Sequence, residues 1–263
     1  MAETPLLQVS EVSLAFGGLK ALEGVSFNVA PGTIKAVIGP NGAGKTTLFH
    51  LISGFLKPDR GRIVFQGAEI QGRPAHEVAS LGIARTFQLV QLFDHLTVLE
   101  NVMVGRHRLT KAGLFAGALH LPWTRREEAA IRERAFAFLE FVGLAERAAQ
   151  PAGFLPLGLK RLLEIARALA SEPTLLLLDE PASGLDQAET ERLGELILTL
   201  KAKGLTILLV EHDMSLTMEV AEEIVVLNYG RLIAEGPPRA IQRHPEVIAA
   251  YLGTDWQGDK GAE

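Results

Sequence analysis

The chain has 263 residues, of which 48% are hydrophobic and 22% charged, and it contains no cysteine. This length and composition predict one large α/β domain with an ordinary core and exclude a disordered, collagenous or coiled-coil chain. Without cysteine there is no disulfide framework, thiol nucleophile or thiolate zinc site. The formal charge of −5 argues against general binding to a nucleic-acid backbone, which requires a basic excess.

No stretch of the sequence is expected to cross a membrane. The aliphatic runs at 175–178 and 207–210 are far shorter than the roughly 20 apolar residues that a bilayer requires. The first seven residues lack the basic start and the apolar run of a signal peptide. The sequence therefore predicts a soluble protein, and any role at a membrane would come through a partner.

The N-terminal third of the chain is predicted to form mainly strands. Val12, Leu14 and Phe16 alternate with polar or small residues, which is the period of a half-buried strand. A glycine-rich turn then separates a β-branched strand from a helix. The elements predicted here are strands near 12–16 and 25–29, a strand at 34–38, a helix at 45–53, and short strands at 62–65 and 83–87.

The pattern changes after Gln88. Few strand-like runs occur between 89 and 153, and residues 127–143 carry apolar side chains at helical spacing. Residues 104–122 are rich in Gly, Leu and His and are predicted to form a loop. This region is therefore expected to be a helical lobe inserted into the α/β core.

Helices and strands alternate again in the remainder of the chain. Asn228, Tyr229 and Gly230 are typical of a hairpin turn, and the tail from Gln257 is expected to be frayed. The elements predicted here are a helix ending at 170, a strand at 175–178, a helix at 188–201, a strand at 206–210 and a hairpin of 224–227 with 232–234.

The clearest chemical motif is the turn between the strand at 34–38 and the helix that follows it. Its glycines let successive backbone N–H groups turn inward, and the helix N-terminus adds partial positive charge, so the loop is predicted to cradle phosphate. Lys45 is expected to reach the β- and γ-phosphates and Thr46 to bind Mg²⁺. The residues that match G-x-x-x-x-G-K-[ST] are Gly39, Pro40, Asn41, Gly42, Ala43, Gly44, Lys45 and Thr46.

A second motif is the apolar strand at 175–178, which ends in Asp179 and Glu180. Alone it is weak, because buried parallel strands often end in an acid. After a phosphate loop it predicts that Asp179 helps to hold Mg²⁺ and that Glu180 polarises an attacking water.

Three further residues gain significance only from their order and spacing. His212 follows the strand at 206–210, at the sheet edge where ligands bind in open α/β folds. Phe16 ends a strand and is placed to close over a nucleotide base, and Gln88 follows the strand at 83–87. Taken singly, a histidine in the position of His212 is more often a solvated loop residue, and a phenylalanine in that of Phe16 is usually part of the core. Gln88 on its own would be an unremarkable strand end.

With these motifs in order, the chain resembles the ATP-binding subunit of an ABC transporter over roughly residues 6–253. The resemblance implies an α/β P-loop NTPase (RecA-like) core with an antiparallel β subdomain and an inserted α-helical subdomain. Within a single domain spanning 1–263, it implies a catalytic core of 1–88 and 165–240. The helical subdomain with a signature loop would then be 89–164, and 241–263 a C-terminal helix and tail.

The resemblance also implies roles for individual residues. Phe16 corresponds to the aromatic residue that stacks on adenine, Gln88 to the Q-loop glutamine, Glu180 to the catalytic base and His212 to the switch histidine. The implied catalytic residues are Lys45, Glu180 and His212, and the implied metal ligands are Thr46, Gln88 and Asp179. The D-loop would consist of Ser183, Gly184, Leu185 and Asp186. The implied nucleotide-binding residues are Phe16, Gly39, Pro40, Asn41, Gly42, Ala43, Gly44, Lys45, Thr46, Thr47 and Gln88.

The signature loop departs from the family pattern LSGGQ. Its counterpart here is Leu155, Pro156, Leu157, Gly158 and Leu159, in which only the first leucine and the second glycine are kept. In the family this loop contacts the γ-phosphate of ATP held by a partner subunit. Proline lacks both the hydroxyl and the N–H, so a weaker contact is expected, although it suits the first turn of a helix. Because Glu180 and His212 are present, an active ATPase is expected rather than a pseudoenzyme.

Shorter strings resemble the ATPase of branched-chain amino acid importers, the LivG type. They include 85–88, 99–102, 163–167, 210–214 and 227–230. The resemblance implies the cofactors ATP and Mg²⁺, a second ATP-binding subunit in a homo- or heterodimer, and integral membrane permease subunits. It further implies indirect cooperation with a periplasmic solute-binding protein, no nucleic acid, and a peripheral position on the cytoplasmic face of the membrane.

Several alternatives stay open at this point. Related ATPases serve urea or amide import or lipopolysaccharide export, and a non-transport ABC ATPase is a further possibility. A G-protein would need an Asn-Lys-x-Asp string, which is absent, and a small-molecule kinase would need neither the D-loop nor His212. The apolar residues after Gln88 either form the core of the lobe or meet a membrane subunit; they are Leu89, Val90, Leu92, Phe93 and Leu96.

Overall fold

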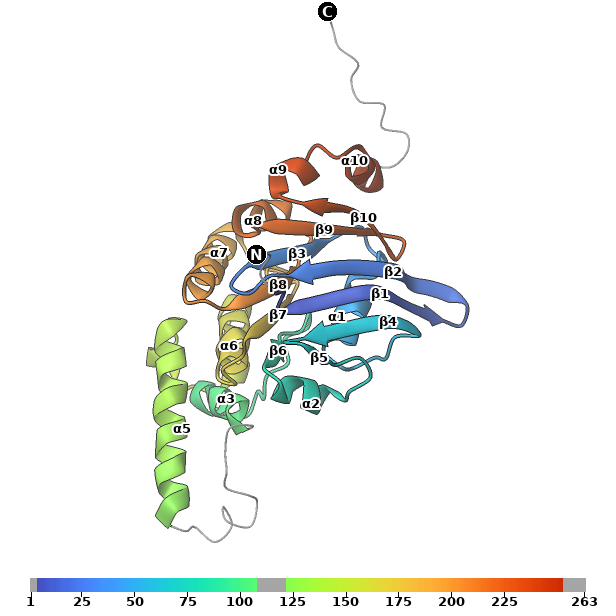
Figure 1. Cartoon of the computed structure of the whole chain (residues 1–263). Coiled ribbons are helices and arrows are strands. Elements are labelled where there is room, and N and C mark those ends of the chain that lie inside the picture. The colour runs from blue at the N-terminus through green and yellow to red at the C-terminus, as the bar shows by residue number, and fades with distance from the viewer. Residues whose placement is uncertain (1–3, 108–121, 253–263) are drawn as a thin grey trace, which may run out of the picture.

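The computed structural model describes residues 4–107 and 122–252, which fold around two β-sheets (Figure 1). The larger sheet has the strand order β10-β9-β3-β8-β7-β6, and all neighbours in it are parallel except β10 and β9. Its central strands are buried along their whole length, as expected for a parallel sheet covered on both faces. The strands are β3 (Ile34–Ile38), β6 (Ile83–Arg85), β7 (Leu175–Asp179), β8 (Thr206–Val210), β9 (Glu223–Asn228) and β10 (Arg231–Gly236).

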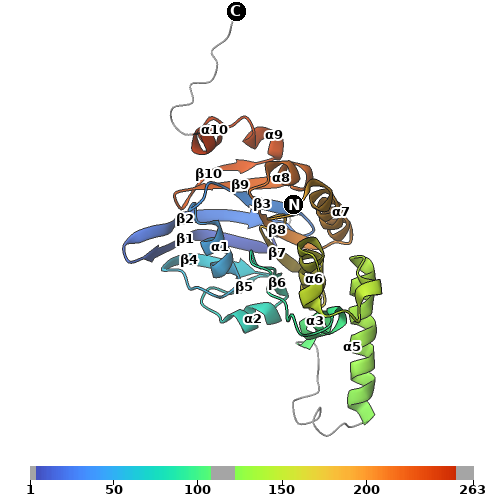
Figure 2. The same cartoon turned by 180° about the vertical axis from the view of Figure 1, so that it is seen from behind.

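The smaller sheet is antiparallel, with the order β2-β1-β4-β5. Its inward residues, such as Val9 and Phe27, share one hydrophobic cluster with Phe49 of helix α1 (Lys45–Ile52) and Leu208 of the larger sheet. Helix α1 is therefore held between the two sheets (Figure 2). The strands are β1 (Leu7–Phe16), β2 (Leu19–Val29), β4 (Arg60–Phe65) and β5 (Ala68–Glu69).

The opposite face of the larger sheet is covered by helices. Ile165 of α6, Ile197 of α7 and Leu216 of α8 belong to a second cluster with Ile207 of β8. Helices α9 and α10 lie along the edge formed by β10 (Figure 1). These helices are α6 (Leu157–Leu169), α7 (Gln187–Ala202), α8 (Met214–Val220), α9 (Pro238–Ile241) and α10 (Pro245–Leu252).

A helical lobe lies between β6 and β7 in the chain and has a hydrophobic cluster of its own. Val98 of α3, Leu139 of α5 and Leu163 of α6 are all buried in it. Because α6 contributes to this cluster and to that of the larger sheet, it joins the lobe to the core. The remaining helices are α2 (Ala75–Ser80), beside β6, and, in the lobe, α3 (Val98–Gly105), α5 (Pro122–Phe141), η2 (Ala145–Arg147) and η3 (Ala152–Phe154).

The structure refines the elements predicted from the sequence. The strand at 206–210 is confirmed, and the helix predicted at 127–143 begins at Pro122 and ends at Phe141. The strand predicted to end at 87 stops at Arg85, so that 86–88 form the start of a loop. The predicted loop at 104–122 overlaps the ends of α3 and α5; its part at 108–121 and the tail from Gln257 lie outside the described residues.

Helices α2, α3 and α8 were not predicted, since each has eight residues or fewer and too few turns for an apolar period to stand out. A signal for α3 existed in the capping box of Thr97 and Glu100, whose side chains each bond the other's backbone N–H. Within 4–107 and 122–252, no helix is long and apolar enough to cross a membrane.

The close approach of α3 to α6 depends on Gly105. A Cβ built at this position would overlap the carbonyl oxygen of Arg167 and lie 3.1 Å from the Cβ of Ala170. We predict that Gly105→Ala lowers the free energy of unfolding by about 1–3 kcal/mol, since the packed helices must separate. Urea denaturation measures this, with the half-exposed neighbour Val104→Ala as the control, expected within about 0.5 kcal/mol of the parent. Equal stability of the two variants would contradict the close packing.

Candidate functional site

The loop between β3 and α1 is shaped by glycines that no other residue replaces easily. Gly44 has φ +103°, and a Cβ there would lie 2.6 Å from the carbonyl oxygen of Ala21. Gly39 has φ +150°, and a Cβ there would overlap the carbonyl of Leu227. The loop is thus pressed against β2 and the end of β9 and leads directly into the N-terminus of α1, a position that suits a phosphate.

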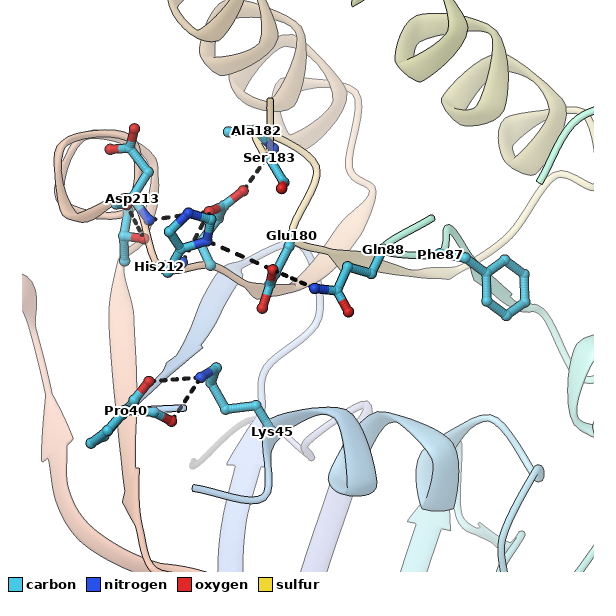
Figure 3. A network of polar contacts seen from close by, with 12 residues as sticks. Pro40, Lys45, Phe87, Gln88, Glu180, Ala182, Ser183, His212 and Asp213 are labelled. Carbon is cyan, nitrogen blue, oxygen red and sulfur yellow. Dashed lines mark hydrogen bonds and ion pairs between the residues drawn. The ribbon is translucent and has the colours of Figure 1, made fainter. Parts of the chain in front are cut away.

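Lys45, the first residue of α1, directs its side chain back across this loop. Its Nζ donates to the carbonyl oxygens of Gly39 at 2.6 Å and Pro40 at 3.1 Å (Figure 3). Burial lowers the pKa of the amine, and the carboxylates of Glu180 and Asp179 act in the opposite direction. The lysine therefore offers a partly desolvated positive charge at the centre of the loop, close to two acids.

Asp179, at the end of β7, is almost fully buried, and its two carboxylate oxygens have different surroundings. Its Oδ2 accepts a hydrogen bond from Nη2 of Arg85 at 2.7 Å, whereas Oδ1 has no hydrogen-bond partner among the described residues. A buried acceptor without a partner is costly. The free oxygen therefore fits the role expected of Asp179 in holding Mg²⁺.

The described residues contain no cluster of three acids or histidines that could enclose a metal by itself. Magnesium in nucleotide sites characteristically uses one or two protein oxygens together with phosphates and water. Asp179 and the exposed hydroxyl of Thr46, which lies along the same cavity as Lys45, form a donor set of that type.

Glu180 contacts two other residues that the sequence analysis assigned to the site. Its Oε2 accepts a hydrogen bond from Nε2 of Gln88 at 3.0 Å and lies 3.7 Å from Nδ1 of His212 (Figure 3). The backbone of Glu180 has φ +46°, a conformation that non-glycine residues rarely adopt and that concentrates at functional sites. The structure thus brings Gln88, Glu180 and His212 together at the sheet edge that also carries Lys45.

A cavity of about 500 Å³ opens over this edge. Residues 41–47 form its floor, Gln88 and Glu180 line it, and Tyr229 of the β9–β10 turn closes another side. Phe16 does not line the cavity; it pairs in register with Leu19, which does, and its side chain is half exposed. Its predicted contact with adenine stays a prediction.

A buried acid that the sequence analysis did not identify, Glu211, joins the residue before the D-loop to the loop that carries His212. Glu211 accepts hydrogen bonds from the backbone N–H of Ala182 at 2.7 Å and from those of His212 and Asp213 at 3.0 and 3.2 Å. Burial raises the pKa of this carboxyl, and the three amides oppose the rise. Asp186, at the end of the D-loop, caps α7 through the N–H of Glu189.

Two charged residues that the sequence analysis also did not identify, Arg161 and Glu164, connect α6 to the loop that contains Gln88. Arg161 donates to the carbonyl oxygens of Phe87 at 2.9 Å and Gln88 at 2.7 Å, and more weakly to that of Ser183 at 3.4 Å. One turn along α6, Glu164 accepts from the backbone N–H groups of Phe87 and Gln91, both at 3.3 Å. Both side chains are buried, so α6 and this loop form one unit. The signal was a pair of charges on the apolar face of a predicted helix.

The signature loop lies apart from the cavity, against its own D-loop. A Cβ at Gly184 would come within 2.9 Å of Cδ2 of Leu157. Leu155 is buried in the core of the lobe, whereas Pro156 and Leu157 are exposed. Pro156 is the N-cap of α6 and makes no side-chain cap, so the first amides of that helix are not bonded by a capping side chain.

Comparison with known proteins gives consistent results. A family model described as ABC transporter matches residues 22–183, and one described as branched-chain amino acid ATP-binding cassette transporter matches 231–256. The chain is 45% identical over 250 residues to the high-affinity branched-chain amino acid transport ATP-binding protein LivG of Escherichia coli K12, covering 95% of this chain and 98% of that protein. BraF of Pseudomonas aeruginosa, described in the same words, is 46% identical with the same coverage.

Solved structures agree. A nucleotide-free ATP-binding cassette from an ABC transporter superposes with a TM-score of 0.83 at 35% identity, covering 95% of this chain and all of that one. A dimeric post-hydrolysis cassette bound to ADP and Pi gives a TM-score of 0.75 at 26% identity, covering 89% and 99%. The predicted P-loop NTPase fold is therefore confirmed, together with the nucleotide binding and the ATPase activity that the family implies. The chain belongs to the ABC transporter family, as an ATP-binding cassette.

Proposed function

We propose that the chain is the ATP-hydrolysing subunit of an importer for branched-chain amino acids, working at the cytoplasmic face of the membrane. One observation carries the catalytic part of this proposal: Glu180 is held between Gln88 and His212 at the sheet edge that bears Lys45. The solute is supported by the relatives' names and by the match of 231–256 to a module of branched-chain amino acid cassettes. That match favours this solute over the urea, amide and lipopolysaccharide systems.

Binding of the triphosphate is expected at the loop of residues 39–47. Lys45 would exchange its bonds to the Gly39 and Pro40 carbonyls for the phosphate oxygens, which are stronger acceptors because they are charged. The adenine would lie toward Leu19 and Lys20, beyond which Phe16 ends β1. The positive end of α1 adds to the attraction.

Magnesium would be held by Asp179 and Thr46, with Gln88 at its periphery, and supplies charge neutralisation at the phosphates when bound. The attack on the γ-phosphorus is the work of the protein's own groups. Glu180 accepts a hydrogen bond from Gln88 through a nearly buried carboxylate and would orient a water and take its proton. Gln88 and His212 fix that carboxylate from two sides.

Completion of the site is expected to need a second ATP-binding subunit. The signature loop of this chain does not line its own cavity, so the contact of that loop with ATP would be made across a dimer. The amides at the N-terminus of α6 and the helix dipole would serve there in place of the missing serine hydroxyl. Purification of the assembled transporter, followed by identification of its ATP-binding subunits, would show whether the partner is a second copy of this chain or a related chain.

A groove between the core and the lobe fits the expected docking of a permease subunit. It has a volume of about 500 Å³ and is lined by residues of β6, α2, α3 and α6. Phe55, Phe93 and Val104 line it and are 55%, 51% and 41% exposed. Exposed aromatic side chains in a concave surface are typical anchors of a protein interface.

The apolar residues after Gln88 were expected either to form the core of the lobe or to meet a membrane subunit, and different residues support each expectation. Leu92 packs against the core of the lobe, whereas Leu89 and Phe93 are exposed. The exposed pair supports docking of a membrane subunit at this stretch, and Leu92 supports a structural role.

The catalytic assignment predicts two different defects. Glu180→Gln should bind ATP as the parent does and lose at least about a hundredfold in hydrolysis, because only proton abstraction is removed. Lys45→Ala should lose roughly tenfold or more in ATP affinity, because charged hydrogen bonds to phosphate are lost. Equilibrium nucleotide binding and phosphate release, measured with the transporter partners present, separate the two.

Ser80→Ala, on the exposed end of α2, serves as the control and should behave as the parent does in both measurements. Equal hydrolysis by Glu180→Gln and the parent would remove Glu180 from the mechanism. Unchanged nucleotide binding and hydrolysis by Lys45→Ala would defeat the proposed function.

The groove predicts a defect in coupling rather than in chemistry. Phe93→Ala should weaken association with the permease subunits by about tenfold or more, as loss of an aromatic anchor does. Basal ATP hydrolysis of the isolated subunit should stay the same. Co-purification and transport assays in vesicles measure the first, and phosphate release the second.

The matched control is Phe136→Ala, an exposed phenylalanine of α5 that lines a different groove of the lobe. A similar loss of association in both variants would show that the groove is not the docking surface.

A further inference from the structure

Arg85, the last residue of β6, is the arginine that meets the carboxylate of Asp179. Its Nη2 lies 2.7 Å from Oδ2 of Asp179, and its Nη1 donates to Oγ of Ser53 at 2.8 Å. Ser53 is the C-cap of α1, the helix that begins at Lys45. The guanidinium therefore spans the end of the phosphate-loop helix and the end of β7.

Aromatic rings hold this guanidinium in one place. Its central carbon lies 5.6, 5.8 and 5.2 Å from the ring centres of Phe49, Phe55 and Phe87. The side chains of Arg85 and Asp179 are only 5% and 2% exposed. Burial lowers the pKa of Arg85, and the hydrogen bond to Asp179 opposes that shift.

The consequence of this arrangement falls on Asp179. Because Oδ2 is taken by Arg85, the carboxylate cannot turn freely, and Oδ1 is left buried with no hydrogen-bond partner among the described residues. We propose that Arg85 is a positioning residue for the magnesium site, which orients Asp179 so that Oδ1 is presented to the metal. The inference rests on the proposed function, because it takes Asp179 as a magnesium ligand.

A lysine cannot perform this task in the same way. The planar fork of arginine reaches the hydroxyl of Ser53 and the carboxylate of Asp179 with separate nitrogens while lying among the aromatic rings. An ammonium group has a single nitrogen and no plane to stack. The competing explanation is a purely structural ion pair, whose loss would weaken the fold and all ligand binding alike.

Binding of a fluorescent N-methylanthraniloyl ATP to the full chain distinguishes the two explanations. The dissociation constant is measured with excess Mg²⁺ and again in EDTA, and their ratio is the magnesium-dependent gain. Arg85→Gln should reduce this gain by about tenfold, which is typical for loss of a group that orients a metal ligand. The affinity measured in EDTA should stay that of the parent. Equal losses in the two conditions, or no loss, would overturn the inference.

A double variant tests whether Arg85 acts through Asp179. Asp179→Asn alone should lose the gain, and adding Arg85→Gln to it should cause no further loss, because the carboxylate to be oriented is already gone. Additive losses would overturn the inference. Arg106→Gln is the matched control: Arg106 is also a mostly buried arginine, but it pairs with Glu172 at 2.9 Å, and the gain should be unchanged.

If Arg85→Gln does not fold, Arg85→Lys and Ser53→Ala carry the test. Arg85→Lys should bind in EDTA as the parent does and still lose most of the gain, and Ser53→Ala should show a smaller loss in the same direction. A full gain in both would overturn the inference. A parent chain without any magnesium-dependent gain would instead refute the proposed function, so the two failures can be told apart.

Discussion

The parallel ladder of β3, β8 and β7 is the constraint on which the site depends. Val37 of β3 pairs with Val210 of β8, and Val210 pairs with Asp179 of β7, so the three strands end within one residue of one another. All three strands are buried throughout, and a shift of one residue would turn the side chains of each strand to the opposite face. The loops that follow the strands therefore emerge at one edge, and they carry the phosphate loop, Glu180 and His212. Hydrophobic packing of the strands thus sets distances between polar groups that share no local sequence.

A second layer of contacts ties the helical lobe to that edge. Arg161 and Glu164 are buried charges, and burying charges is costly unless their hydrogen bonds are filled. Here most of these bonds are made to backbone groups of the loop containing Gln88, and Arg161 also reaches the D-loop at Ser183. Nε of Arg161 is left without a hydrogen-bond partner among the described residues. Because α6 starts at the signature loop, these contacts form a continuous path from that loop to Gln88 and, through its hydrogen bond, to Glu180. The lobe is thus linked to the catalytic edge through main-chain contacts.

The fold class and the phosphate loop could be predicted from the sequence because their signals are local. Glycines, Lys45 and an apolar strand stand next to one another in the chain, and Asp179 and Glu180 directly follow four consecutive leucines. Arg85 could not be found in this way, and the only signal for Arg161 was a charge on the apolar face of a predicted helix. Their partners lie 94 and 74 residues away, and three of the four groups that they bind most closely are a serine hydroxyl and two backbone carbonyls, which leave no mark in a sequence. Phe16 was assigned to the adenine from its order and spacing relative to the other motifs. In the structure its cross-strand partner Leu19 lines the cavity and Phe16 does not.

Two of the three departures in the signature loop are exposed, whereas the third, Leu159, is half-buried and packs against the core of the lobe. Leu155 and Gly158 are buried: the first packs into the core of the lobe, and a Cβ at the second would overlap the carboxylate of Glu189. These are the two residues that keep the family pattern. Pro156 and Leu157 are exposed, and they are among those that differ. Packing of Leu155 thus holds the loop at the start of α6, while the exposed side chains at 156 and 157 carry no hydroxyl. The partner's nucleotide would meet backbone amides and a helix N-terminus, whose positive end does not depend on side-chain identity.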